Sequence, residues 1–371
     1  MDVVLENGLP PTANSIGLQS SQDRPEFTGV FFDDMLLATS FAPSLGNAQP
    51  WDIKWLGSAL QLKMNRAATT AIDIKHRASL VAIGAASLNA EVVAAHHQQQ
   101  YSVEHFPVKK NLDLVTKVSP NDASDIDAEQ ARFYPYLLQR KTNRLMGDQK
   151  PLPTKVVSQL REVTKHYPVK FHMLSEPEHL SSYAEIMTES DRLRHFNKQL
   201  HHEMTGELIW PSDEKIAEGI DVNTLGLEDN DLNSLSILHR LDVVEELAGW
   251  QGGEALGDYN RSRITSASAV VVLTVNSGSA RDYVVGGKAM QYFWLAAEQL
   301  KLAVQPIIPI SLYAKNDKDA EALVAEEYID QVINLKHSFN SLFSLAEGEF
   351  PVIAFRVCFA PEPEIRSLRR S

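Results

Sequence analysis

The sequence predicts an α+β fold built from two unequal versions of one unit. Two long segments, 78–98 and 283–301, are rich in small residues and apolar on nearly all sides, which predicts two helices buried at the centre of the molecule. Each is preceded and followed by a short segment with the pattern of a strand. A long acidic and largely helical segment, 178–250, interrupts the second unit.

Composition excludes several classes of protein. The 371 residues are 44% hydrophobic and 22% charged, as in a globular protein with an ample core. A net charge of −13 argues against a nucleic-acid partner, and no apolar run approaches the roughly 20 residues that span a bilayer. The single cysteine, Cys358, excludes an internal disulfide and fits a reducing cytoplasm, and the acidic N-terminus lacks a secretory pattern. No spacing predicts a metal site.

The first unit is predicted over 29–125, after a polar lead-in arm over 1–28. Apolar residues at helical spacing predict its first helix, and Pro43 prevents that helix from continuing. Alternating residues after Pro50 then predict a half-buried strand. The expected elements are helix 31–41, strands 51–56 and 59–64, the buried helix 78–98 and strand 101–106.

The second unit is predicted over 126–371, and a polar connector at 117–130 leads into it. The run AVVVLTV at 269–275 predicts a strand buried on both faces. The acidic segment 178–250 is an insert that the first unit lacks. The expected elements are helices 129–139 and 153–166, strands 168–174 and 269–275, the buried helix 283–301 and strand 307–312.

The most informative motif is the run APSLGNAQPW at 42–51, which reads as helix end, tight polar loop and strand. Its two prolines hold the loop, so that short polar side chains can direct hydroxyl and amide groups at a flat polar heterocycle or its ribityl chain. The run resembles the flavin-contacting loop of the nitroreductase-like flavoproteins, Ala-Pro-Ser-x-x-Asn-x-Gln-Pro-Trp. The resemblance implies flavin contacts from Pro43, Ser44, Asn47 and Gln49.

Members of that family are intertwined homodimers with FMN between the subunits. A fused pair of units would form an internal pseudo-dimer, which resembles the Acg-like branch. Because only the first unit carries the polar loop, the resemblance implies one FMN per chain and a monomer. The insert 178–250 would then be a lid or substrate-side segment, although its composition fits a solvated helical face equally well.

Two basic segments suit the FMN phosphate. The run RKTNR at 140–144 resembles the family's Arg-Arg-Ser-x-Arg segment, and guanidinium groups are planar, forked donors for phosphate oxygens. The basic tail resembles the family's C-terminal segment that returns to the phosphate. A solvated helix end and a solvated tail remain alternatives. The candidate residues are Arg140, Lys141, Thr142, Arg144, Arg366 and Arg369.

Two further segments resemble those that line the flavin ring. Asn260 would meet the pyrimidine edge, and Arg263 would place positive charge near N1, where it stabilises the reduced flavin. The same residues also fit a polar turn before a strand. In the segment 302–309 a backbone N–H of Ile307 or Ile308 would face N5, and prolines replace the acidic residue and glycine common in relatives. The expected ring contacts there are Gln305, Pro306, Ile307 and Ile308.

The resemblance therefore implies a cytoplasmic FMN-dependent oxidoreductase. Hydride would pass from NADH or NADPH through flavin N5 to a nitro, quinone or similar small acceptor. No side chain need serve as an acid or base, since the flavin carries the redox chemistry. The alternative is an FMN-binding protein that sequesters flavin or senses redox state without appreciable turnover.

Overall fold

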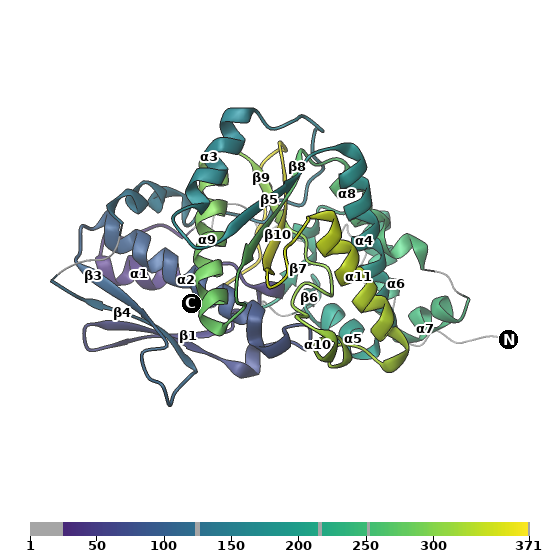
Figure 1. The fold of residues 1–371 in the computed structure, drawn as a ribbon, viewed down its shortest axis with the longest axis horizontal. Helices are drawn as coiled ribbons and strands as arrows, with labels where there is room; N and C mark the ends of the chain where they lie inside the picture. Colours follow the sequence, from purple (N-terminus) through teal and green to yellow (C-terminus); the bar gives the residue numbers. More distant parts are fainter. Residues whose placement is uncertain (1–24, 123–126, 214–216, 251–252, 370–371) are drawn as a thin grey trace.

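The computed structural model describes residues 25–122, 127–213, 217–250 and 253–369. Most of the predicted arm over 1–28, and the predicted boundary between residues 125 and 126, lie outside these residues. Two four-stranded antiparallel sheets and the helices around them confirm the α+β class (Figure 1). The division into two units stays a prediction.

The first sheet and its helices come from the N-terminal third of the chain. The strands pair in the order β1-β2-β4-β3, all antiparallel. The long helix lies, in sequence, between the second and third strands. The elements are α1 (Phe31–Ser40), β1 (Trp51–Leu56), β2 (Ala59–Met64), α2 (Arg77–His96), β3 (Tyr101–His105) and β4 (Leu114–Pro120).

The second sheet repeats the topology of the first. Its strands pair in the order β5-β8-β10-β9, again antiparallel, and its long helix again lies between the second and third strands. This shared order favours the predicted duplication. The elements are α3 (Thr154–Thr164), β5 (Lys170–Leu174), β8 (Ala269–Val275), α9 (Ala280–Gln299), β9 (Ala303–Pro306), α10 (Asp317–Glu321), α11 (Ile329–Leu342) and β10 (Phe350–Cys358).

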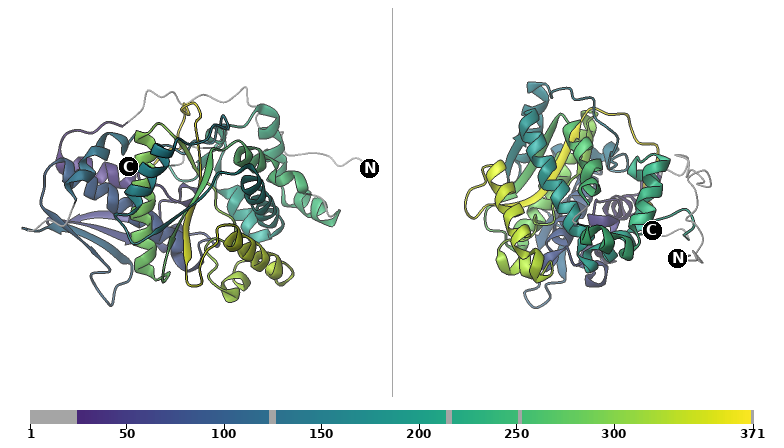
Figure 2. Two further views of the ribbon diagram at one scale, coloured as in Figure 1. Left: turned by 45° about the horizontal axis from the view of Figure 1, so that its top comes forward. Right: turned by 90° about the vertical axis from the view of Figure 1, so that its right-hand side faces the viewer.

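The insert separates the first two strands of the second sheet. Its longest helix, α4, packs against α11 and α8 on the side of that sheet opposite α9 (Figures 1 and 2). Most of its residues are helical, as the sequence predicts. The elements of the insert are α4 (Pro177–Phe196), α5 (Lys198–Gly206), β6 (Leu208–Ile209), β7 (Ile220–Asp221), α6 (Asp229–Leu238) and α7 (Leu241–Gly249). The helix α8 (Asp258–Thr265) follows the insert and precedes β8.

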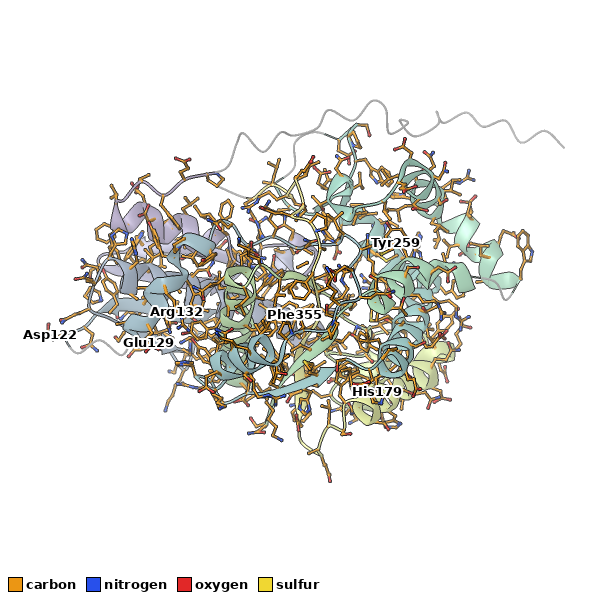
Figure 3. All side chains as sticks on the ribbon, turned by 90° about the horizontal axis from the view of Figure 1, so that it is seen from above. Asp122, Glu129, Arg132, His179, Tyr259 and Phe355 are labelled. Atoms are coloured by element: carbon orange, nitrogen blue, oxygen red, sulfur yellow. The ribbon has the colours of Figure 1, made fainter. Side chains whose placement is uncertain are left out.

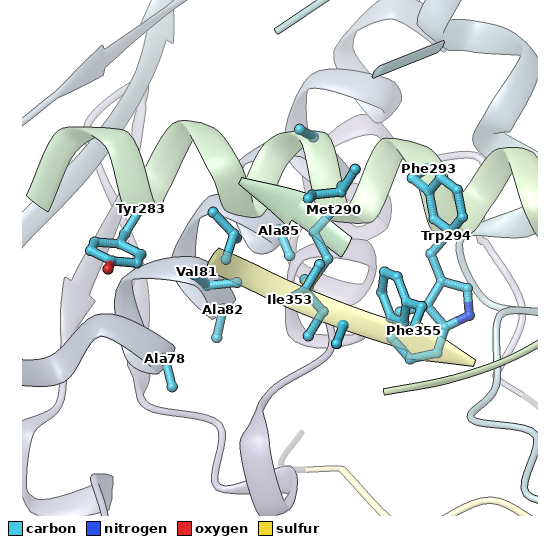
Figure 4. Close-up of a cluster of buried hydrophobic side chains, with 14 of the residues drawn as sticks. Ala78, Val81, Ala82, Ala85, Tyr283, Met290, Phe293, Trp294, Ile353 and Phe355 are labelled. Carbon is cyan, nitrogen blue, oxygen red and sulfur yellow. The ribbon is translucent and has the colours of Figure 1, made fainter. Parts of the chain in front are cut away.

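The two long helices cross at the centre of the molecule, where small residues allow close contact. A Cβ atom on Gly84 would overlap the carbonyl oxygen of Val284, and one on Gly287 would overlap the carbonyl oxygen of Val81. Side chains from α2, α9 and β10 meet beside this crossing (Figure 4). Figure 3 shows Phe355 of β10 in this crowded interior. The prediction of two buried central helices is confirmed.

The helix spanning Ile74–His96 is long and apolar enough to cross a membrane by length and composition, contrary to our reading of the sequence. However, 94% of its apolar window is buried inside the molecule. The core of the protein therefore accounts for its hydropathy.

Three sequence expectations were wrong. The strand expected at 307–312 is β9 (Ala303–Pro306), because pairing with β10 ends at Ile307 and Pro309 has no N–H to continue it. The helix expected at 129–139 is a 3₁₀ segment over Ala128–Tyr136 with Pro135 inside. The start of the connector at 117–130 belongs to β4, whose Lys117 pairs with Gln61.

Candidate functional site

A cavity of about 270 Å³ opens between the two halves of the chain. This volume lies just below the range of about 300–1,000 Å³ that is usual for small-molecule sites. Segments that are far apart in the sequence meet at this cavity: the polar loop at 43–47, the segment 140–144, the end of β9 with the residues after it, and the C-terminal tail. Fourteen of the sixteen residues predicted from the sequence line it: Pro43, Ser44, Asn47, Arg140, Lys141, Thr142, Arg144, Asn260, Gln305, Pro306, Ile307, Ile308, Arg366 and Arg369.

The apolar wall of the cavity comes from the two central helices and β10. Its side chains belong to the buried cluster of Figure 4, so a rigid core supports this wall. Apolar surface of this kind suits an aromatic ligand. The residues are Ala78, Val81 and Ala82 of α2, Met290 and Trp294 of α9, and Ile353 of β10.

The polar loop at 43–47 forms another wall. Gly46 and Asn47 adopt left-handed backbone conformations, with φ of 58° and 56°. The Ser44 Oγ accepts a hydrogen bond of 2.9 Å from the Gln49 N–H, which closes the loop on itself. The Asn47 Nδ2 donates to the carbonyl oxygens of Gly219 and Leu368, at 2.9 Å each. Asn47 thereby joins the loop to the insert and to the C-terminal tail.

Gln49 is one of the two predicted residues outside the cavity wall. Its side chain is fully buried, and its Nε2 donates to the carbonyl oxygens of Ala217 at 2.6 Å and Asn47 at 3.2 Å. Backbone carbonyls therefore hold this amide behind the loop. In this structure Gln49 supports the loop rather than lining the cavity.

Three arginines gather at one end of the cavity. Arg140 is 5% exposed, lies 4.4 Å from the ring centre of Trp294 and donates to the Phe41 carbonyl at 3.0 Å. Burial, together with the charges of Arg369 and Arg366, holds its pKa well below the usual range, although the charge of Glu298 acts in the opposite direction. Burial and Arg366 likewise lower the pKa of Arg369 to about 9. This cluster of like charges would be stabilised by an anion.

The tail that carries two of these arginines is fastened to the segment 140–144. The Lys141 Nζ lies 2.6 Å from a carboxylate oxygen of Glu362 and donates to the Pro363 carbonyl at 2.8 Å. The Asn143 Nδ2 donates to the Pro361 carbonyl at 2.7 Å. The positive charge of Lys141 is thus already paired, whereas no ion pair forms at Arg140 within the described residues.

Arg263 is the second predicted residue outside the cavity wall. Its guanidinium donates to the Leu225 carbonyl and lies 4.1 Å from the ring centre of Tyr259, which Figure 3 labels on α8. Burial lowers the pKa of Arg263 to about 10. These contacts turn the charge away from the cavity. Asn260 does line the cavity, where its Nδ2 donates to a carboxylate oxygen of Asp191 at 2.6 Å.

The segment after β9 lines the cavity through Ile307 and Ile308. The Ile307 N–H donates to the Ala354 carbonyl at 2.9 Å, so it is already bonded within the sheet. The Ile308 N–H is bonded to no other described residue. Of the two N–H groups proposed from the sequence, Ile308 is therefore the one available to a ligand.

Three charged cavity residues in the insert escaped the sequence analysis. Asp191 and Arg194 follow the cavity-lining Met187 at helical spacing on α4, which is the signal that could have revealed them. The Arg194 Nε is buried without a partner in the described structure. Glu207 packs its carboxyl against Gly46, and burial raises its pKa. The insert thus contributes two carboxyl groups and one guanidinium group to the cavity.

Comparison with known proteins gives few points of reference. No family model matches the sequence. An uncharacterised protein of Mycobacterium tuberculosis is 35% identical over 329 residues, which is 89% of this chain and 46% of that protein. The chain therefore spans about half the length of this relative.

Solved structures give weak overall matches. Iodotyrosine deiodinase bound to FMN and 3-iodo-L-tyrosine is 10% identical, covers 64% of this chain and 95% of its own, and has a TM-score of 0.35. A nitroreductase with bound FMN from Bacteroides fragilis is 11% identical, covers 65% and 94%, and has a TM-score of 0.35. A nitroreductase-like protein from Bacillus cereus is 14% identical, covers 64% and 90%, and has a TM-score of 0.34. At these scores the functional argument rests on the cavity itself.

Proposed function

We propose that this chain is an FMN-dependent oxidoreductase of the nitroreductase type, with one FMN in the cavity. The observation that carries the proposal is the cluster of Arg140, Arg366 and Arg369, whose mutual repulsion an anionic ligand would relieve. Arginine suits phosphate through its forked donors. The FMN phosphate would lie at this end of the cavity.

The remaining walls suit the rest of the cofactor. Ser44 and Asn47 offer a hydroxyl and an amide to the ribityl chain, and the Asn47 Oδ1 is buried without a partner in the described structure. The apolar wall from α2, α9 and β10 would pack against the isoalloxazine ring. The Gln305 Oε1 is likewise buried and unpartnered, and the Ile308 N–H is available beside it. When bound, FMN supplies hydride transfer chemistry.

The rest of the proposal follows from the same cavity. NADH or NADPH would reduce the bound flavin, and a nitro, quinone or similar small molecule would accept the hydride. Because residues of both halves build the one cavity, the chain would act as a monomeric pseudo-dimer with neither nucleic acid nor membrane as partner. We further propose a cytoplasmic location, since the single Cys358 is an unpaired, buried thiol.

Purified protein reconstituted with FMN tests this function. We expect a yellow protein whose flavin absorbance bleaches anaerobically with NADH or NADPH and returns on addition of a nitro compound or quinone. Retained flavin that neither donor reduces would contradict the oxidoreductase.

One observation favours the alternative function, FMN binding without appreciable turnover. The two Asn47 hydrogen bonds, to Gly219 of the insert and Leu368 of the tail, tie both segments across the polar loop. If this closure persists around FMN, donors and acceptors would not reach the ring. In that case the bound flavin would remain oxidised in the presence of NADH and NADPH yet be reduced by dithionite.

A further inference from the structure

Asp191 lies beside the segment after β9, which contributes Ile307 and Ile308 to the cavity wall. Two side chains of α4 fasten that segment: the Tyr183 hydroxyl donates to the Ile307 carbonyl at 2.7 Å, and the Ser190 Oγ accepts from the Ile310 N–H at 2.7 Å. Asp191 follows Ser190 directly and lines the cavity. Its place is therefore fixed relative to Ile308.

The other carboxylates of this stretch of α4 have partners outside the cavity. Glu185 pairs with Arg261, and Glu189 binds Arg192 through two hydrogen bonds of 2.8 and 2.6 Å. Neither glutamate lines the cavity. Among these three carboxylates, only that of Asp191 can therefore touch a molecule bound there.

The surroundings of Asp191 allow its carboxyl to hold a proton at mildly acidic pH, up to about pH 6. Burial raises its pKa to about 6, although the hydrogen bond from Asn260 of α8 and the charge of Arg194 on its own helix act in the opposite direction. Among the described residues of α5, α7, α8 and α11, which pack against α4, no further charge shifts this pKa. The charge of Asp191 in turn acts with burial to raise the pKa of the Tyr183 hydroxyl.

We propose that Asp191 is the proton donor to the electron acceptor, an inference that rests on the proposed function. A nitro acceptor gains a hydride from the reduced cofactor and a proton from the Asp191 carboxyl. It leaves as the nitroso compound and one water, because the two hydrogens leave with one nitro oxygen. The Asp191 O–H bond breaks in this step, the cofactor ends oxidised by two electrons, and solvent returns the proton to the carboxylate. The hydrogen bond from the Asn260 Nδ2 holds the Asp191 carboxyl in place.

The test uses the holoprotein, reduced anaerobically with dithionite and mixed with 4-nitroacetophenone at several pH values. The wild-type rate of flavin reoxidation should be constant below about pH 6 and fall about tenfold per pH unit above it, as the protonated fraction falls. Asp191→Asn should remove the fall of the rate above about pH 6 and should lower the rate at about pH 5 by roughly 100- to 10,000-fold. Glu189→Gln, on the same helix outside the cavity, should keep the wild-type profile.

A second readout does not depend on turnover. In infrared difference titrations of the apoprotein, the carboxylic-acid C=O band of Asp191 should disappear with a midpoint near pH 6 and be absent in Asp191→Asn. A variant with the wild-type rate profile, or a wild-type titration without this band, would overturn the assignment. Failure to retain FMN, or reduced flavin that the acceptor never reoxidises, would instead refute the proposed function.

Discussion

Replacing Arg140 by alanine should weaken FMN far more than riboflavin, which lacks the phosphate. The Arg140 guanidinium also packs on Trp294 and donates to the Phe41 carbonyl, so part of the effect will be structural. That part should affect both flavins equally. Losing one charge-assisted hydrogen bond to phosphate costs about 1.5–3 kcal/mol, which is about 10- to 150-fold in affinity. The structure therefore predicts the ratio between the loss of affinity for FMN and the loss of affinity for riboflavin.

Fluorescence titration of the apoprotein with each flavin measures both dissociation constants. Arg132→Ala is a matched control, because Arg132 also lies over an aromatic ring, 4.8 Å from the centre of Phe133, but does not line the cavity. It should leave both affinities unchanged. If Arg140→Ala weakens FMN and riboflavin by the same factor, Arg140 does not bind the phosphate and the reasoning fails.

Three further predictions concern packing, pH and the flavin potential. Gly84→Ala should lower the free energy of unfolding by at least about 1–3 kcal/mol in thermal denaturation, whereas Gly206→Ala, with open space around its Cβ position, should not. Burial raises the pKa of Glu349, but hydrogen bonds from Lys170, Thr274 and His172 outweigh it and lower this pKa to about 2. The stability that the Glu349 carboxylate contributes is therefore present above about pH 4.5 and lost toward pH 2. Glu349→Gln should flatten this part of an acid denaturation curve. Arg263→Gln should shift the midpoint potential of bound flavin by less than about 30 mV in spectroelectrochemistry, because its charge faces Tyr259; a larger fall would place Arg263 at the ring.

Local patterns predicted the regular elements well. The run AVVVLTV is β8, fully buried, because a continuous apolar run suits a strand covered on both faces. The strand order of each sheet was not predictable, because it depends on pairing between distant segments such as β8 with β10. The final strand, β10, was missed although eight of its nine residues are buried.

For the site, the resemblance identified residues that the structure brings together around one cavity. Local patterns could not show whether each side chain points into that cavity or away from it. Gln49 and Arg263 are directed away from the cavity by carbonyls at Ala217 and Leu225, which lie in the insert. The same insert supplies Asp191, whose role depends on its neighbours in space. The insert has no counterpart in the family's motifs, so the motifs around Gln49 and Arg263 could not show which contacts the insert makes with these two residues.

The central claim is that one cavity, built by both halves of the chain, binds one FMN. Isothermal titration of the apoprotein with FMN, checked by flavin released on denaturation, measures the stoichiometry directly. We predict one FMN per chain. Two FMN per chain would contradict one flavin site shared by both halves, and no binding would contradict the flavoprotein itself.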